Sequence, residues 1–195
     1  MAVEPDDRLA AFLRETIVDE ALTVVISTLE EAVLREASFD LGLSATAFHW
    51  LEEDLALTKV AKLLRPGGWW AMVWNIFGDL QRPDPFHEAT KILLSSPCSP
   101  SAGSGNIPFA LDADARLAAL ERTRAFDRVE QQTSTWELLL DSDQTVALYA
   151  TYSNINIRPD RETVLAELGR IARDEFHGRV TRNMVTTLYV ARRRS

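Results

Sequence analysis

Acidic side chains follow the first two short apolar runs of the chain. Glu4 comes directly after Ala2-Val3, and Glu30 and Glu31 follow the run that ends near Thr28. A carboxylate at the end of a strand can accept hydrogen bonds from two ribose hydroxyls, and a second acid can accept from an adenine amino group. From position alone, acids exposed to solvent near a chain end or a helix start are the favoured interpretation. One wall of a nucleoside site is the alternative.

An aromatic cluster with one titratable side chain follows the third apolar run. Phe48, His49 and Trp50 come shortly after residues 39–45. An aromatic face can border a cationic ligand or a flat substrate, and a histidine can accept a proton near neutral pH. The alternative is that Phe48 and Trp50 pack a helix onto a sheet. Packing is favoured for Trp50. For His49, a role as proton acceptor and a hydrogen bond to a backbone group are equally favoured.

The sequence lacks the motifs that several other kinds of chemistry require. Ser44 has no GxSxG turn to expose it as a nucleophile, and no GxxxxGK[ST] phosphate loop occurs in the chain. Cys98 is the single cysteine and cannot form an internal disulfide, while His87 and His177 are isolated from other metal-ligating residues. The sequence therefore predicts neither acyl transfer nor a metal site.

The elements that must position these residues alternate between helix and apolar strand. Expected in order are a helix over 7–17, strands over 22–27 and 39–45, a helix over 51–64 and a strand over 69–75. The strands read as continuous apolar runs, which is typical of strands buried on both faces of a parallel sheet. This order predicts a doubly wound α/β sheet, which binds ligands at the carboxyl ends of its strands.

Two local signals accompany this part of the chain. Arg65-Pro66-Gly67-Gly68 is expected to end the preceding helix and to reverse the chain tightly into the next strand, because proline cannot continue a helix and glycine permits the reversal. Asn75 is expected directly after that strand, at the edge where ligands bind. Asn75 is therefore a fourth position at which a site residue is expected, after Glu4, after Glu30-Glu31 and after the segment that follows residues 39–45.

The second half of the chain is less regular. Expected there are a short helix over 86–94, an irregular loop over 95–105, a strand over 126–140, a helix from the capping box of Asp141 and Gln144 to about 152, a helix over 160–176 and a closing strand over 180–191. We predict a single domain over 1–195. Its parts are a first half over 2–77, a variable lid or loop region over 78–125 and C-terminal strands and helices over 126–195.

Composition limits the classes of partner. Of the 195 residues 46% are hydrophobic, and the net charge is −8. A chain this acidic is a poor general binder of nucleic acid or of anionic membranes. The acidic N-terminus does not resemble a signal peptide, and no run approaches the roughly 20 apolar residues of a membrane span. We therefore expect a cytoplasmic protein without nucleic-acid or membrane partners.

Residues from several of these segments carry a family resemblance. They are Val3-Glu4-Pro5, Thr28-Leu29-Glu30-Glu31, Ser38-Phe39-Asp40, Ser44-Ala45-Thr46-Ala47-Phe48-His49-Trp50, Leu64-Arg65-Pro66-Gly67-Gly68 and Val73-Trp74-Asn75, in this order. Together they resemble the type 11 group of class I S-adenosylmethionine-dependent methyltransferases, over residues 2–75. A weaker likeness continues through the Trp136 strand to the closing strand. The resemblance implies a Rossmann-like, mostly parallel sheet with an antiparallel C-terminal strand.

The resemblance also implies a cofactor and a set of roles. S-adenosylmethionine would bind with Glu4 on its ribose, Glu30 and Glu31 by its adenine, Ser44 and Ala45 along its methionine side, and His49 and Trp50 facing the transferred methyl and the acceptor. The reaction would be an in-line displacement at a sulfonium, for which alignment and exclusion of water suffice. No catalytic residue is predicted, and the acceptor is expected to be a small molecule.

One departure from the family pattern is large. Family members begin with a strand and a GxGxG loop, whereas here Met1 stands immediately before the second strand and no GxGxG occurs. We therefore expect an N-terminally truncated sheet, with the missing part encoded upstream. A non-catalytic remnant that acts as a binding or oligomerisation module, for example as a homodimer, and a minimal binder that recruits a partner strand are the alternatives. A nicotinamide-dependent reductase is a minor competitor.

Overall fold

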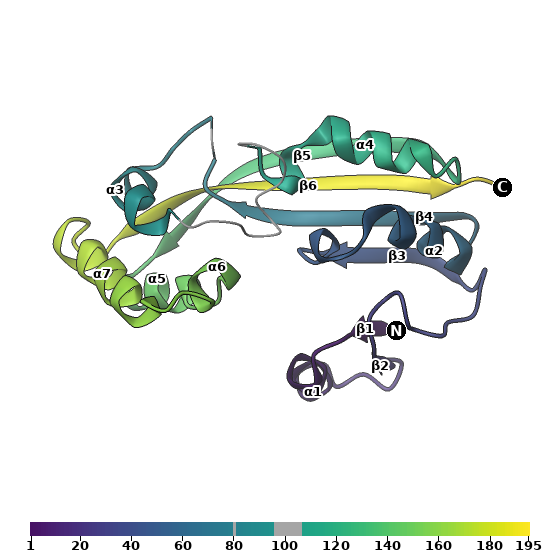
Figure 1. Cartoon of the computed structure of the whole chain (residues 1–195), viewed down its shortest axis with the longest axis horizontal. Coiled ribbons are helices and arrows are strands. Elements are labelled where there is room, and N and C mark those ends of the chain that lie inside the picture. Colours follow the sequence, from purple (N-terminus) through teal and green to yellow (C-terminus); the bar gives the residue numbers. More distant parts are fainter. Residues whose placement is uncertain (80, 96–106) are drawn as a thin grey trace. The chain divides into compact units, whose positions relative to one another are not determined.

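The computed structural model describes residues 1–79, 81–95 and 107–195 (Figure 1). The chain divides into two compact units. Unit 1 contains Met1–Met72, Asp114–Glu130 and Val190–Ser195, and unit 2 contains Val73–Ala113 and Gln131–Tyr189. Most of the predicted loop over 95–105, including Cys98, lies outside the described residues.

Unit 1 is built mainly from the first elements of the chain. They are β1 (Ala2–Glu4), α1 (Asp7–Thr16), β2 (Val24–Ile26), β3 (Phe39–Ala45), the 3-10 turn η1 (Phe48–Trp50), α2 (Glu53–Leu63) and the start of β4 (Leu64–Phe77). Every helix and strand predicted for this segment is present. The helix α4 (Ala113–Arg122) was not predicted from the sequence, and its buried Arg116 pairs with Glu53 at 2.9 Å.

Unit 2 contains the remaining helices. They are α3 (Pro85–Leu94), the 3-10 turn η3 (Phe109–Leu111), α5 (Ser142–Tyr149), α6 (Ser153–Asn156) and α7 (Arg161–Asp174). The long strands β5 (Phe126–Leu140) and β6 (Val180–Arg193) run through both units, as β4 does. The predicted helices over 86–94 and 160–176 and the two predicted C-terminal strands are confirmed.

Side-chain caps fix where several helices begin. The carboxylate of Asp6 accepts from the backbone N–H groups of Arg8 and Leu9 at the start of α1, and the side chain of Glu52 accepts from Leu55 N–H at the start of α2. Asp141 and Gln144 form the predicted capping box at the start of α5. Each cap satisfies N–H groups that have no partner within the helix.

The strands form two separate sheets. β1 pairs with β2 in parallel, with Ala2 opposite Val24 and Glu4 opposite Ile26. The second sheet has the order β3-β4-β6-β5. The arrows of β3 and β4 point the same way in Figure 1, and the arrow of β6 points against them. The predicted α/β architecture with an antiparallel C-terminal strand is therefore confirmed.

Three local predictions about β3 and β4 are wrong. The strand β3 is not buried on both faces, since Leu41 and Leu43 are each 62% exposed. The physical reason is that β3 is an edge strand, with β4 as its partner in the sheet. The expected tight turn at residues 65–68 lies within β4, although Gly67 does adopt a left-handed φ of +80°. β4 also continues to Phe77, so Asn75 is inside the strand and not after it.

The core of unit 2 gathers where the sequence predicted it. Val164, Leu168 and Ile171 of α7 are buried, as expected from their helical spacing, and pack with Phe86 of α3. Phe176 is partly buried, with its ring 5.2 Å from that of Phe86. This cluster holds α3 in place, and α3 carries the only histidine of the predicted lid. Among the described residues, no helix is long and apolar enough to cross a membrane.

Candidate functional site

Glu4 lies at the carboxyl end of β1, where a ligand of an α/β sheet is expected. Its Oε1 accepts a hydrogen bond of 2.9 Å from the backbone N–H of Asp6, which orients the carboxylate over the start of α1. Within the described part of the chain, Oε2 makes no hydrogen bond. Glu4 is half-buried, so one oxygen is fixed and the other remains able to accept from a ligand hydroxyl.

The turn after β2 lies at the same end of the small sheet as Glu4. The parallel register of β1 and β2 brings their carboxyl ends together, with Glu4 opposite Ile26. Thr28 Oγ1 accepts from Glu31 N–H at 3.2 Å, and Lys59 Nζ donates to the carbonyl of Glu30 at 2.8 Å. These bonds hold the backbone of the turn while the carboxylates of Glu30 and Glu31 stay exposed. The structure therefore places three of the predicted acids along one edge.

The end of β3 contains a backbone feature that sequence reasoning missed. Ser44 is half-buried and Ala45 is exposed at the carboxyl end of the strand. The next residue, Thr46, has a φ of +50°, in the left-handed region. A β-branched residue rarely adopts this conformation, and its occurrence costs about 1–3 kcal/mol. The strained residue turns the chain sharply away from β3 and into η1. No sequence signal announced it, since glycine or asparagine is usual at such a position.

The aromatic cluster divides into one core residue and two surface residues. Phe48 is fully buried, with its ring 5.9 Å from that of Trp70. His49 is half-buried, and Trp50 is 58% exposed, with the two ring centroids 5.4 Å apart. The expectation that Trp50 packs a helix onto the sheet is therefore wrong, because Phe48 fills that place. Burial lowers the pKa of His49 below its ordinary value, so its neutral form is favoured near pH 7.

All seven predicted site residues belong to unit 1. Glu4 and the Glu30-Glu31 turn are brought together by strand register, and His49 lies beside Trp50. Ser44 and Ala45 end a strand of the other sheet. A cavity of about 360 Å³ in unit 1 lies elsewhere, between the 32–36 segment and α2, and none of the seven residues lines it.

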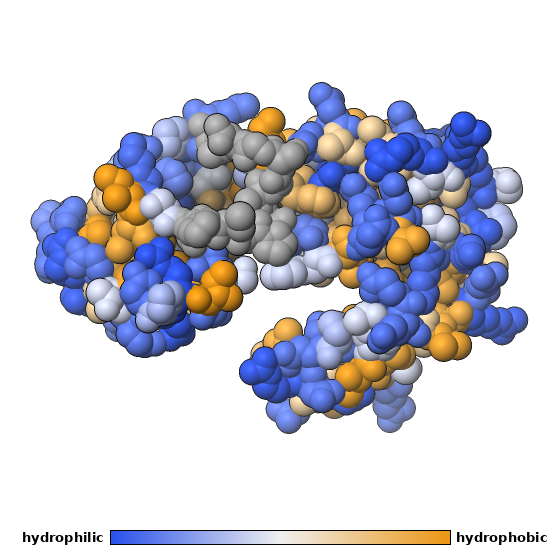
Figure 2. Space-filling model, viewed as in Figure 1, coloured by the Kyte–Doolittle hydropathy of each residue, from blue (hydrophilic) through white to orange (hydrophobic). Residues whose placement is uncertain are grey.

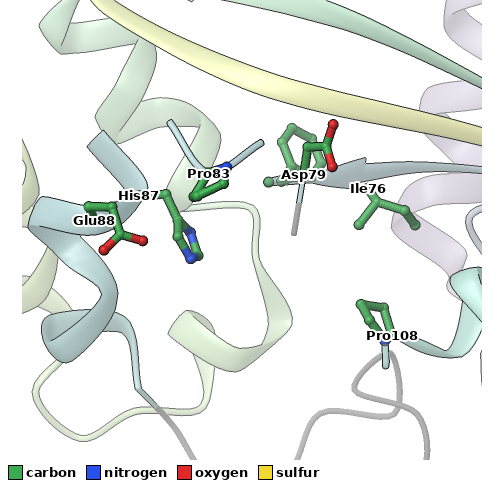
Figure 3. Close-up of a pocket in the computed structure, with 8 residues that line it drawn as sticks. Ile76, Asp79, Pro83, His87, Glu88 and Pro108 are labelled. Atoms are coloured by element: carbon green, nitrogen blue, oxygen red, sulfur yellow. The ribbon is translucent and has the colours of Figure 1, made fainter. Parts of the chain in front are cut away.

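Unit 2 contains a smaller cavity of about 220 Å³ in the predicted lid region. Its lining residues come from the end of β4, the loop that follows, the start of α3 and the loop before η3. They are Ile76, Phe77, Gly78, Asp79, Pro83, His87, Glu88 and Pro108. In Figure 3 the ring of His87 projects from α3 toward the space that Ile76 and Pro108 border. The ring has both donor and acceptor capacity, and Asp79 and Glu88 are the acidic residues of the same lining.

A buried ion pair fixes the helix that carries His87. Arg182 Nε lies 3.0 Å from Asp84 Oδ2, and the two side chains are 2% and 1% exposed. Asp84 also accepts from the backbone N–H groups of His87, at 2.7 Å, and Asn183, at 2.9 Å. Arg182 donates in addition to the hydroxyl of Tyr149. Burial raises the pKa of Tyr149 to about 12, so the phenol stays neutral. The aspartate therefore caps α3 and anchors it to β6.

Asn75 takes part in a chain of hydrogen bonds between strands. Its Oδ1 accepts from Thr186 Oγ1 at 2.6 Å, and the same hydroxyl accepts from Trp136 Nε1 at 2.9 Å. Asn75 therefore links β4 to β6 and β5. Its predicted place at a ligand-binding edge is not what the structure shows, because the strand runs on past it.

Comparison with known proteins supports the resemblance over the first part of the chain. A family model described as a methyltransferase domain matches residues 1–72. Two curated relatives, uncharacterized methyltransferases of Mycobacterium tuberculosis and Mycobacterium bovis, are each 36% identical over 75 residues. That match covers 38% of this chain and 30% of each relative, so the chain spans about a third of the length of the curated relatives it matches. The predicted resemblance to class I methyltransferases is confirmed for this segment.

Solved structures extend the likeness to the whole chain. A candidate Type II methyltransferase from Anaeromyxobacter dehalogenans aligns with a TM-score of 0.62 and 20% identity, over 99% of this chain and 79% of that one. A candidate methyltransferase from Bacillus halodurans aligns with a TM-score of 0.59 and 13% identity, over 100% of this chain and 82% of that one. At these identities the likeness concerns the fold, and it confirms the Rossmann-like methyltransferase architecture.

Proposed function

We propose that this chain binds S-adenosylmethionine and takes part in the transfer of its methyl group to a small-molecule acceptor. One observation carries the proposal: the segment that matches a methyltransferase domain, residues 1–72, contains all seven residues predicted for the cofactor and the acceptor. The fold of the described residues agrees with such an activity. The chain covers only part of its curated relatives, so the proposal concerns what these residues contribute.

The donor set of unit 1 fits a nucleoside. Glu4 offers Oε2 to the ribose hydroxyls while Oε1 is held by Asp6 N–H. Glu30 and Glu31 stand at the same edge as Glu4, on a turn whose backbone is fixed, and can accept from the adenine amino group. In this proposal Ser44 and Ala45 border the methionine side of the cofactor.

When bound, S-adenosylmethionine supplies a methyl group on a positively charged sulfonium. The exposed ring of Trp50 offers a π face that attracts such a cationic centre. His49, whose pKa is lowered by burial, is neutral near pH 7 and can accept a proton from an acceptor hydroxyl or amine. In the proposed step the acceptor's lone pair forms the new bond to carbon, and the C–S electron pair remains on sulfur.

The acceptor is proposed to be small. A lid of variable composition, predicted over 78–125, suits a small molecule more than a polymer. The acidic net charge of −8 disfavours a nucleic-acid acceptor for electrostatic reasons.

Isothermal calorimetry with S-adenosylmethionine and with its demethylated product tests the proposal. We expect binding by the 195-residue chain and a loss of affinity of about 10-fold or more in Glu4→Gln, because a charged acceptor of ribose hydrogen bonds contributes about 1.5–3 kcal/mol. Glu15→Gln, on the exposed end of α1, is the matched control and should bind like the parent. Absence of heat with both ligands would remove the proposal for this chain.

A non-catalytic binding module is the second candidate function. The observation in its favour is that β1 and β3 are both edge strands of separate sheets within unit 1. Edge strands offer unpaired backbone groups to another chain. This function predicts a dimer or larger assembly in light scattering and no heat with S-adenosylmethionine. A monomer that binds the cofactor contradicts it.

A further inference from the structure

We propose that the cavity of unit 2 binds a small organic carboxylate. The carboxylate group would lie between the side chains of Arg182 and His87, and the apolar body of the ligand would lie along the apolar part of the lining. All the residues concerned belong to unit 2. The inference goes beyond the proposed function, because it concerns another part of the chain and requires no S-adenosylmethionine.

Gly78 leaves an open point between two nitrogen atoms at the wall of this cavity. A methyl side chain at Gly78 would have Arg182 Nη2 at 3.5 Å and His87 Nδ1 at 3.6 Å as its nearest neighbours. These are ordinary van der Waals distances, so an atom of that size fits there. Both nitrogens lie within 3.6 Å of one point, so each oxygen of a carboxylate can accept from one of them at the usual charge-assisted distance of about 2.8 Å.

Arg182 has a donor nitrogen that its buried network does not use. Its side chain is 2% exposed, its Nε pairs with Asp84, and its Nη1 donates to the hydroxyl of Tyr149. Within the described part of the chain, Nη2 makes no hydrogen bond. Unpaired donors of a buried charged group are costly. A ligand oxygen at the open point beside Gly78 would satisfy this donor.

His87 provides the second donor. Its backbone N–H is held by Asp84 at 2.7 Å, which fixes the ring at the start of α3. The imidazole itself makes no hydrogen bond to any residue that the structure describes, and in Figure 3 it projects from α3 toward the space that Pro108 borders. A protonated imidazole donates from both nitrogens. It can therefore bind a carboxylate oxygen through Nδ1.

The charge balance around the ring favours a ligand with one negative charge. Each nearby acid has its own cation, and the pairs are Asp79 with Arg82 at 2.9 Å, Glu88 with Lys91 at 2.6 Å and Asp84 with Arg182 at 3.0 Å. Burial raises the pKa of Tyr149 and of Tyr152, so both phenols are neutral. The surroundings are thus balanced when His87 is neutral and gain one positive charge when it is protonated. A bound carboxylate compensates that charge, so binding should be accompanied by proton uptake.

The size and the walls of the cavity define the rest of the ligand. Its apolar lining residues are Ile76, Phe77, Pro83 and Pro108. Its volume of about 220 Å³ is below that of pockets for drug-sized ligands, so a carboxylate with a single ring or a short chain fits best. Figure 2 shows mostly hydrophilic side chains over α3 and α7 on the face in view, with small hydrophobic patches among them. Protein partners usually need a larger apolar patch, which favours a small molecule.

A nuclear magnetic resonance titration of the 195-residue chain with benzoate tests the proposal. Benzamide, which has the ring without the charge, and inorganic phosphate, which has charge without the apolar body, are the comparison ligands. At pH 6 we expect benzoate to bind with a Kd below about 1 mM and the other two at least tenfold more weakly. The amide signals of Gly78 and His87 should shift. The affinity for benzoate should fall at least tenfold from pH 6 to pH 8, because a histidine loses its proton in this range.

Two histidine variants locate the effect. His87→Gln should bind benzoate at least tenfold more weakly at pH 6 and with little dependence on pH, since glutamine can donate a hydrogen bond but cannot take up a proton. His177→Gln is the matched control. His177 is exposed in the turn after α7 and is not part of the cavity lining, so this variant should keep the affinity and the pH dependence of the parent.

Several outcomes overturn the proposal. One is absence of saturable benzoate binding up to about 10 mM. Others are equally tight binding of benzamide or phosphate, and parental affinity and pH dependence in His87→Gln. Binding that shifts neither Gly78 nor His87 also overturns it, because the ligand would then lie elsewhere. The titration contains no S-adenosylmethionine, so its result is separate from that of the calorimetric test of the proposed function.

Discussion

Thr46 shows how a site residue can escape sequence analysis. The types and order of Glu4, Ser44 and His49 predicted which residues gather near strand ends, and the structure places each of them there or in the turn that follows. The left-handed conformation of Thr46 could not be predicted, because it is imposed by the path between β3 and η1 and not by the preference of threonine. The exposure of individual side chains could not be predicted either: packing was expected for both aromatic residues, and Phe48 is buried whereas Trp50 is 58% exposed.

Relief of this strain should be measurable. In Thr46→Gly we expect the free energy of unfolding to rise by up to about 1 kcal/mol, because the left-handed penalty is removed while the flexibility of glycine in the unfolded chain offsets part of the gain. Chemical denaturation monitored by circular dichroism gives the value. Thr58→Gly in the exposed middle of α2 is the control and should lose about 0.3 kcal/mol, because glycine is only slightly poorer than threonine in a helix. A loss of stability in Thr46→Gly would contradict the strain argument.

His49 should make stability depend on pH. Its pKa in the folded chain is lowered from 6.5 by burial, so its contribution is fully present above pH 6.5 and is lost as the pH falls through the lower folded value. We therefore expect the difference in unfolding free energy between the parent and His49→Gln to shrink as the pH is lowered from 7.5 to 5. Urea titrations at several pH values measure it. Thr46→Gly, with no titrating group at that position, should keep the slope of the parent.

At the scale of elements, periodicity and capping were reliable and burial was not. The apolar spacing of α7 and the capping box of α5 appear in the structure as predicted. The prediction that β3 is buried on both faces was wrong. A run of apolar residues indicates a buried central strand only when the sheet has a partner strand on each side, and among the described strands β3 pairs with β4. The helix α4 was missed although alanine and leucine favour a helix there. Its packing includes a pairing of the buried Arg116 with Glu53, which the sequence does not reveal.

The ion pair between Asp84 and Arg182 should dominate the stability of α3. Both side chains are almost fully buried, so removal of one partner leaves an uncompensated charge. We expect Asp84→Ala and Arg182→Met each to cost about 3–5 kcal/mol of unfolding free energy, and the double variant to cost clearly less than their sum. A double-mutant cycle in urea measures the coupling. Lys91→Ala, which breaks an exposed pair with Glu88 on the same helix, is the control and should change stability by less than about 1 kcal/mol.

At the scale of the whole molecule, the two units share three strands. β4, β5 and β6 each begin in one unit and end in the other. A strand cannot melt in one half without fraying the hydrogen bonds of the other, so we expect the units to unfold together, as the predicted single domain requires. Sequence alone could not reveal the division, since no break in composition marks it.

Fluorescence and circular dichroism can test this cooperativity. Trp70 lies in unit 1 and Trp74 in unit 2, and they are 5% and 2% exposed. In variants that keep only Trp70 or only Trp74 of the five tryptophans, the emission shift should have the same urea midpoint as the loss of far-UV circular dichroism measured on the same variant. Separate midpoints in either variant would show that the two units unfold independently.

The exposure of Trp50 gives the candidate site a distinct fluorescence emission. An indole in water emits at longer wavelength and is reached by dissolved quenchers, whereas the indoles of Trp70 and Trp74 are shielded from both effects by the core around them. Trp50 is 58% exposed and stands next to His49, and Trp136 is 40% exposed. In a Trp136→Phe variant, a ligand that binds at the surface of Trp50 therefore changes the red edge of the emission spectrum. The protein thus contains its own optical sensor, through which unlabelled libraries of small molecules can be screened before any reaction product is known.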